Sequence, residues 1–194
     1  MRNFVPKNAH LVPPQAKLAF RGQIFDIYQW QQKMFDGSYA TFEMAKRPDT
    51  VNVIVIRDDK IVVISDEQPG RAAKLSLPGG RHDHDDETEL DAAQRELAEE
   101  TGLIFRNWKL VDVYEPIKDT NKLEWMIYVF VATDFEAETN QQLDAGEKID
   151  VRYLTYDDMV ALIDSGEAGY LASLRDLLAK AGSIEGLKNL PEMV

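Results

Sequence analysis

Two apolar runs separated by an Asp-Asp pair constrain the fold more than any other part of this chain. Residues 51–57 and 61–65 are rich in valine and isoleucine, and Asp58 and Asp59 lie between them. β-Branched residues favour strands, and a short polar break between two such runs is typical of a hairpin. We therefore expect a β-hairpin that is buried in the core of the protein.

Strands and helices alternate around this hairpin. Further strands are expected at residues 22–30 and 39–45 around the turn signal Asp36-Gly37, and at residues 75–77, 108–114, 123–132 and 149–154. Helices are expected at residues 87–101, after a capping Thr155, and at about residues 168–180. Strands on both sides of a central helix, with helices at the end, predict an α/β or α+β sandwich. Trp108 and Trp125 lie in apolar strands and are expected in its core.

Composition excludes several classes of function. The 194 residues include no cysteine, so disulfides, thiolate zinc sites and a cysteine nucleophile are excluded. No run of about 18 apolar residues predicts a membrane span, and residues 1–17 lack the apolar segment of a secretory signal, so we expect a cytoplasmic protein. The formal charge of −12 argues against binding to nucleic acid.

The helix at 87–101 carries an unusual concentration of carboxylates. At 100° per residue, Glu96 and Glu100 share one face and Glu99 borders it. Oxygen ligands at this spacing suit a hard divalent cation such as Mg²⁺, which proteins hold together with substrate phosphates. The preceding Gly79 and Gly80 allow the backbone to approach a metal or phosphate closely. The pattern indicates a phosphate ester or diphosphate substrate.

The acidic run and the residues near it also have simpler structural interpretations. An acidic run is often a solvated helix face, and Asp91 and Arg95 have the spacing of an ordinary helical ion pair. His82 and His84, with the aspartates around them, have the pattern of a metal cluster, but alternating polar residues on a loop more often face solvent. Tyr28 shares a strand face with Trp30, where core or dimer packing competes with stacking on a nucleotide base.

The sequence from Glu87 to Leu103 resembles the Nudix box, G-x5-E-x7-R-E-U-x-E-E-x-G-U, where U is a bulky apolar residue. The part from Glu87 onward matches without a gap. Upstream there is one residue too many between Gly80 and Glu87, and we interpret it as a bulge in the loop that enters the helix. The resemblance extends over roughly residues 18–180 and is greatest to the ADP-ribose pyrophosphatase branch.

This resemblance implies a fold, a metal site and roles for individual residues. The fold would be a Nudix α/β/α sandwich with a mixed sheet. The box would bind Mg²⁺, or alternatively Mn²⁺, through Glu96, Glu99 and Glu100, with the carbonyl of Gly79 as a weaker candidate. Glu87 and Arg95 would pair to brace the loop, and Gly102 would end the helix.

The branch also implies residues outside the box. Glu147, with Asp144 as the alternative, would be the general base, so Glu147, Glu99 and Glu100 are the candidate catalytic residues. Pro116, Arg81 and Tyr28 are the candidate substrate contacts. Against the branch, residues 65–70 lack the arginine that relatives often carry there, and Ser76 occupies a position where glutamate is usual.

The expected organisation is an arm (1–17), a β-hairpin lobe that forms a homodimer (18–48), a Nudix domain (49–181) and a frayed tail (182–194). The expected activity is hydrolysis of a nucleoside diphosphate sugar such as ADP-ribose to a nucleoside monophosphate and a sugar phosphate. Another diphosphate-linked nucleotide is the alternative substrate. A catalytically silent binding module and a plain dimeric structural protein are the rival classes.

Overall fold

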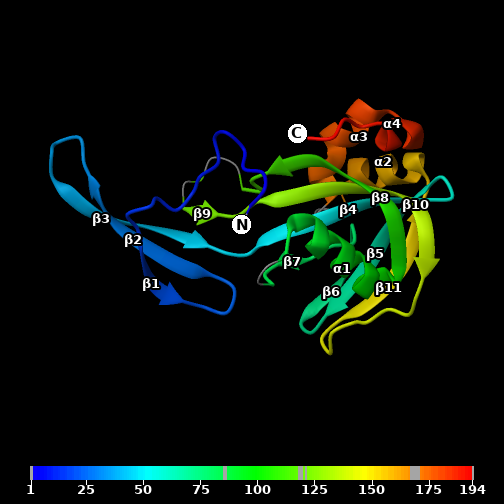
Figure 1. Ribbon diagram of the computed structural model, residues 1–194, viewed down its shortest axis with the longest axis horizontal. Coiled ribbons are helices and arrows are strands. Elements are labelled where there is room, and N and C mark those ends of the chain that lie inside the picture. Colours follow the sequence, from blue (N-terminus) through cyan, green and yellow to red (C-terminus); the bar gives the residue numbers. More distant parts are fainter. Residues whose placement is uncertain (1, 85–86, 118–119, 121, 167–170, 194) are drawn as a thin grey trace.

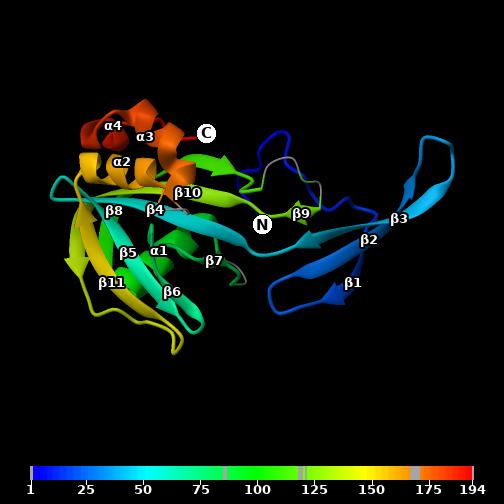
Figure 2. The same ribbon diagram turned by 180° about the vertical axis from the view of Figure 1, so that it is seen from behind.

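The computed structural model describes residues 2–84, 87–117, 120, 122–166 and 171–193 (Figure 1). An elongated molecule results, in which a β-rich lobe projects from a larger α/β body (Figures 1 and 2). Within the described residues, no helix is long and apolar enough to cross a membrane.

The body is built on one mixed sheet. Its strands run in the order β11 (Lys148–Leu154), β5 (Lys60–Gln68), β4 (Asp49–Arg57), β10 (Ile127–Glu138) and β8 (Leu103–Tyr114). Strand β6 (Arg71–Ser76) pairs with β5, and the short β7 (Arg81–His82) pairs with β4. Only β4 and β10 run parallel among these described pairs.

The expected hairpin at 51–65 is present at the centre of this sheet as β4 and β5. Asp58 and Asp59 adopt φ angles of 50° and 55°, as a tight hairpin turn with the right-handed strand twist requires. Side chains alternate along β4, so Val53 and Val55 face one layer while Ile54 and Ile56 face the other. Both sets are buried, which means that the sheet must be covered on both faces.

Helices supply the two covering layers. Helix α1 (Glu89–Thr101) lies on the face of Val53 and Val55, and its fully buried Leu97 contributes roughly 2 kcal/mol through burial of its side chain. The other face is covered by α2 (Tyr156–Ser165), a 3₁₀ turn η1 (Leu171–Leu174), α3 (Arg175–Ala181) and α4 (Ile184–Lys188). The predicted α/β/α sandwich with a mixed sheet is confirmed.

Local sequence sets both ends of α1. The Thr88 hydroxyl accepts a hydrogen bond from the Asp91 amide, and the Asp91 carboxylate accepts one from the Thr88 amide. Asp91 therefore caps the helix and does not form the ordinary pair with Arg95 that its spacing allows. Gly102 ends the helix at φ 73°, as expected, and a Cβ there would lie 2.2 Å from the Thr139 carbonyl oxygen.

The lobe is a separate sheet with the order β1 (Lys17–Arg21), β2 (Asp26–Lys33), β3 (Tyr39–Lys46) and β9 (Leu123–Glu124). The expected hairpin around Asp36-Gly37 is β2–β3, and β1 adds a strand that we did not expect. The run expected as one strand at 123–132 is divided. Its first two residues pair with β3 in the lobe, and β10 begins in the body at Ile127.

The prediction of a frayed tail is wrong, and the arm is held by contacts that the sequence did not predict. The arm has no regular structure but is bound to the body, because Arg2 forms ion pairs with the buried Asp49 and Glu124 at 2.6 and 2.8 Å. The tail is not frayed, since α4 forms within it and Leu187 and Leu190 are buried in the core. These short segments contain too few apolar residues for the sequence to reveal that they pack against the rest of the protein.

Candidate active site: a cleft with an acidic end and a cationic end

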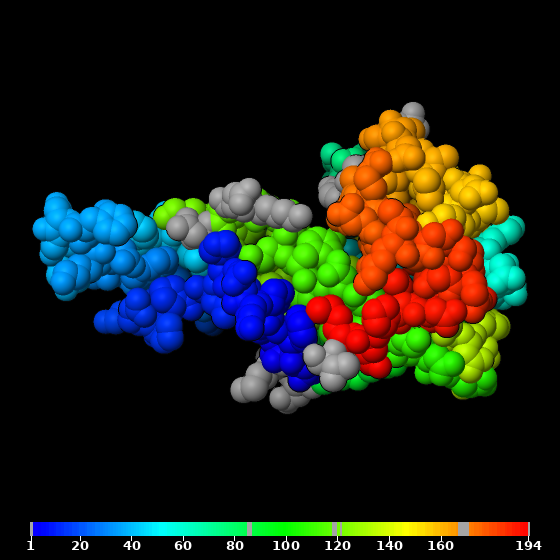
Figure 3. Space-filling model, turned by 90° about the horizontal axis from the view of Figure 1, so that it is seen from above, coloured from blue at the N-terminus to red at the C-terminus, as the bar shows by residue number. Residues whose placement is uncertain are grey.

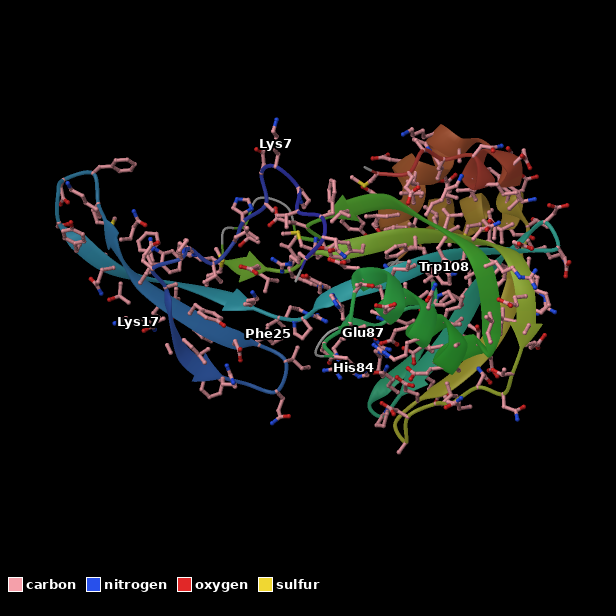
Figure 4. The ribbon with its side chains drawn as sticks, viewed as in Figure 1. Lys7, Lys17, Phe25, His84, Glu87 and Trp108 are labelled. Carbon is pink, nitrogen blue, oxygen red and sulfur yellow. The ribbon has the colours of Figure 1, made fainter. Side chains whose placement is uncertain are left out.

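A pocket of about 430 Å³ lies between α1, the Pro78–Gly80 loop and the segment before β11. Figure 4 shows Glu87 and His84 on the loop that enters α1 beside this region. The described lining includes the four carboxylates on which the sequence prediction depends, and the structure brings them together: Glu96, Glu99, Glu100 and Glu147.

Arg95 organises two of the glutamates. Its guanidinium lies 2.9 Å from Glu96 and 3.0 Å from Glu99, and it donates to Glu87 at 2.8 Å. The expected brace between Glu87 and Arg95 is therefore present, and a further hydrogen bond joins Arg95 to the carbonyl of Arg81. Burial opposes the charge of Arg95, but Glu87 and Glu96 outweigh it and raise the pKa of the guanidinium.

Glu100 is the most buried member of the set. Its carboxylate accepts a 2.7 Å hydrogen bond from the Gly79 amide and is 7% exposed. Burial, then the charges of Glu96 and Glu147, raise the pKa of Glu100 well above its usual value, although the Gly79 hydrogen bond works in the opposite direction. A buried carboxylate surrounded by others is an unfavourable arrangement for a purely structural helix.

The glycines before α1 are required by this packing. A Cβ on Gly80 would lie 2.4 Å from a Glu96 carboxylate oxygen, and a Cβ on Gly79, whose φ is 146°, would lie 2.0 Å from the Val51 carbonyl oxygen. The loop therefore lies against the acidic helix with its backbone exposed to the pocket.

The donor set fits a divalent cation, although its side chains are arranged for ion pairing. Within the described ranges, no three Asp, Glu or His side chains are placed so as to hold a metal ion, because Arg95 engages Glu96 and Glu99. All the candidate ligands are oxygens, which Mg²⁺ and Mn²⁺ prefer. A cation would also relieve the electrostatic cost of the buried Glu100.

The segment that carries Glu147 is attached to the end of α1 by residues that the sequence did not single out. The Gln142 amide donates to the Glu99 carbonyl at 2.8 Å, and the Gln141 side chain donates to the Glu100 carbonyl. Glu147 accepts a 3.2 Å hydrogen bond from the Asp144 amide, and both carboxylates line the pocket. Glutamines in a polar loop carry no recognisable sequence signal.

A second pocket of about 740 Å³ adjoins the acidic one and shares Gly79, Gly80 and Arg81 with it. Pro116, a predicted substrate contact, lines this pocket together with Trp125 and Arg47. Trp125 was expected in the core. It is partly buried against the core and also lines the second pocket. Arg47 was not predicted to lie in the site.

Residues 65–70 contain no arginine, but Arg71 follows them directly. Arg71, at the start of β6, forms an ion pair with Asp66 and lines the second pocket. Asp66 also lines the acidic pocket, and the Oδ1 of Asp66 and the Nε of Arg71 are buried without a hydrogen-bond partner. Pairing across a short hairpin brings these residues together, which a linear pattern does not reveal.

Of the remaining candidates, Tyr28 lies away from the centre, whereas His84 and Asp83 line the acidic pocket. Tyr28 lines a third depression on the lobe side, of about 780 Å³, and not the two pockets described above. His82 bonds through Nε2 with the Glu87 carbonyl at 2.7 Å, and His84 is 60% exposed with its Nδ1 4.0 Å from Glu87. We interpreted one extra residue in the loop 81–86 as a bulge. Residues 85–86 of this loop lie outside the described residues.

The NUDIX domain family matches residues 46–177, which is more than half of the 194 residues. The chain belongs to the Nudix family. The predicted assignment as a Nudix hydrolase is thereby confirmed.

Similar proteins agree with this family. The chain is 27% identical over 151 residues to an ADP-ribose pyrophosphatase of Bacillus subtilis strain 168, covering 76% of this chain and 80% of the relative. A crystal structure of an ADP compounds hydrolase superposes with a TM-score of 0.65 at 20% identity, covering 87% of this chain and 94% of that one. A Nudix hydrolase from Nitrosomonas europaea gives a TM-score of 0.56 at 23% identity, with 70% and 90% coverage. These two structures share the Nudix fold.

Proposed function

We propose that this Nudix hydrolase cleaves the diphosphate bond of a nucleoside diphosphate sugar such as ADP-ribose, with Mg²⁺ as its cofactor and Mn²⁺ as the alternative. The products would be a nucleoside monophosphate and a sugar phosphate. The observation that carries the proposal is the junction of an acidic pocket with a cationic and apolar one across Gly79, Gly80 and Arg81. The similarity to an ADP-ribose pyrophosphatase supports the choice of substrate.

The residues of the acidic pocket have separate roles in this proposal. Glu96, Glu99 and Glu100 would hold the cation, with the Gly79 carbonyl as a weaker ligand. A bound divalent cation neutralises a diphosphate and makes a water molecule more acidic. Glu147, with Asp144 as the alternative, would take the proton of the attacking water. Glu87 and Arg95 fix the loop and the helix, and Gly102 ends the helix.

The direct test is a panel of diphosphate-linked nucleotides with Mg²⁺ and separately with Mn²⁺, with product identification by chromatography. ADP-ribose should give AMP and ribose 5-phosphate. Preferential cleavage of a dinucleoside polyphosphate or an oxidised nucleotide would select the alternative substrate class. Binding of these compounds without any product would favour the catalytically silent binding module.

We also propose that the lobe forms a homodimer. Three of its large side chains are strongly exposed in the single chain, Phe20 at 63%, Tyr39 at 65% and Phe35 fully, and Figure 3 shows the lobe extending away from the body. A small sheet with exposed aromatic residues is stabilised by a second layer. Light scattering should give about twice the 22.1 kDa of one chain, and a mass of one chain would exclude the dimer. A cytoplasmic setting stays a prediction.

A further inference from the structure

Arg47 stands apart from the other arginines of the cleft. Arg71 and Arg81, which also line the second pocket, have carboxylate partners in Asp66 and Asp83. Arg47 forms no ion pair with any described residue, and its Nε donates only a long 3.4 Å hydrogen bond to the Pro48 carbonyl. In a chain with a net charge of −12, a partly buried arginine without a carboxylate partner is unusual.

The position of Arg47 is fixed by aromatic rings. Its guanidinium carbon lies 4.1 Å from the centre of the Trp125 ring and 5.8 Å from that of Phe25. Trp125 is itself anchored, because its indole nitrogen donates to the Thr50 hydroxyl at 3.0 Å. A stacked guanidinium presents its donors in a defined plane, so little conformational entropy is lost when an anion binds.

The electrostatic surroundings of Arg47 favour an anionic ligand. Burial, and then the charge of Arg81, lower the pKa of Arg47, while Asp49 opposes this shift. The two guanidinium groups therefore lie close enough to repel each other, and of the two only Arg81 has a carboxylate partner. Arg81 lines both pockets, so the pair lies where the cationic pocket meets the acidic one.

We propose that Arg47, together with Arg81, binds the phosphate group of the substrate that is remote from the acidic helix. This inference rests on the proposed function and refines it. One phosphate would lie at the carboxylates of α1 with the cation, and the next would lie against the planar donors of Arg47. Arg47 would thus select substrates with two linked phosphates over those with one.

A comparison with Arg57 separates binding from packing. Arg57 ends β4, near whose start Arg47 lies, and its guanidinium carbon is 4.0 Å from the centre of the Phe135 ring. Arg57, however, has a carboxylate partner in Glu138 at 2.8 Å. It also lines neither pocket of the cleft. Both arginines therefore stack on an aromatic ring. Of the two, only Arg47 lines a pocket of the cleft and lacks a carboxylate partner.

The test compares Arg47→Gln and Arg47→Lys with the control Arg57→Gln. For ADP-ribose with Mg²⁺, Arg47→Gln should raise KM at least about tenfold, the loss expected for hydrogen bonds to a charged group. Its kcat should stay within about threefold of that of the wild type, because the carboxylates of α1 are untouched. Arg47→Lys keeps the charge but not the planar arrangement of donors, so its KM should lie between those of the wild type and Arg47→Gln.

Calorimetry supplies a readout without turnover. The affinity for the non-hydrolysable α,β-methylene ADP should fall in Arg47→Gln by the same factor as KM rises, whereas the affinity for adenosine and all constants of Arg57→Gln should not change. Equal affinity of wild type and Arg47→Gln for the methylene compound, or an equal loss for adenosine, would overturn the proposal. If the wild type hydrolysed no diphosphate, the proposed function would fail, and calorimetry would still decide whether Arg47 binds the diphosphate group.

Discussion

The two ends of the cleft are built in different ways. The acidic end draws three of its carboxylates from one turn of α1 and a fourth from the segment attached to that helix by Gln141 and Gln142. The cationic end is assembled from the lobe, the β3–β4 junction, β6, the end of β8 and the 3₁₀ turn η1. A local motif thus creates the first, and only the complete fold creates the second.

This difference has a consequence for specificity. Residues on one helix are held in a fixed spacing, so the acidic end depends mainly on the local sequence of α1. The cationic end changes whenever the lobe or the β5–β6 hairpin changes. In this chain Arg71 reaches the pocket from β6. We expect substitutions at the acidic end to affect turnover and those at the cationic end to affect substrate affinity.

The largest effect is expected from Glu100→Gln. The change keeps size but removes a ligand charge, so kcat should fall by about 10³-fold or more while the fold is retained. Asp91→Asn on the same helix is the control, because Asp91 caps the helix and does not face the pocket. Turnover near that of the wild type at saturating Mg²⁺ would contradict the assignment of Glu100 as a ligand.

A smaller but still large effect is expected from Glu147→Gln. Loss of a general base reduces kcat by about 10²- to 10⁴-fold, with little change in KM. Asp144→Asn is the matched variant, since Asp144 lines the same pocket three residues earlier. A rate profile against pH should lose its acidic limb only in the variant that lacks the base. If Asp144→Asn gave this result and Glu147→Gln did not, Asp144 would be the base.

Trp125→Leu should have a moderate effect on substrate affinity and little effect on kcat. Without the indole ring Arg47 loses its stacking partner, so KM should rise about three- to tenfold without a matching loss of kcat. Trp108→Leu is the control, because Trp108 is also partly buried but packs on Phe130 on the other side of the sheet. Both variants should lose thermal stability, and an equal rise of KM in both would show that the effect is general.

The smallest effect is a pH dependence of stability without metal. Burial raises the pKa of Glu100 well above 4.5, its usual value, so the ionised form is the less stable one in the folded state. As pH rises from about 4.5 through the raised pKa, the folded protein must give up a proton that it binds more tightly than the unfolded chain does. The destabilisation by Glu100 is therefore absent at low pH and complete above the raised pKa.

Thermal melting of metal-free wild type and Glu100→Gln measures this contribution. The variant should have the higher Tm at pH 8, and the difference should vanish as the pH falls towards about 4.5. A difference that is constant over the whole range would mean that ionisation of Glu100 does not contribute.

Sequence alone predicts the parts of the protein that depend on local patterns. The β4–β5 hairpin, helix α1 with its Gly102 cap, and the Glu87–Arg95 brace each follow from neighbouring residues or a contiguous motif. The docked arm, helix α4 and the division of residues 123–132 between two sheets depend on contacts across the fold. Arg47 and Arg71 were missed for the same reason, because their partners are distant in sequence or lie across a hairpin.

The central claim is that one substrate spans both ends of the cleft. A crystal structure of Glu147→Gln with Mg²⁺ and ADP-ribose tests it most directly, because loss of the base slows turnover while the ligand carboxylates remain. We expect the cation and one phosphate at Glu96 and Glu100, with the other phosphate within hydrogen-bonding distance of Arg47. A diphosphate bound outside the acidic pocket, or one whose two phosphates both lie beyond reach of Arg47, would contradict it.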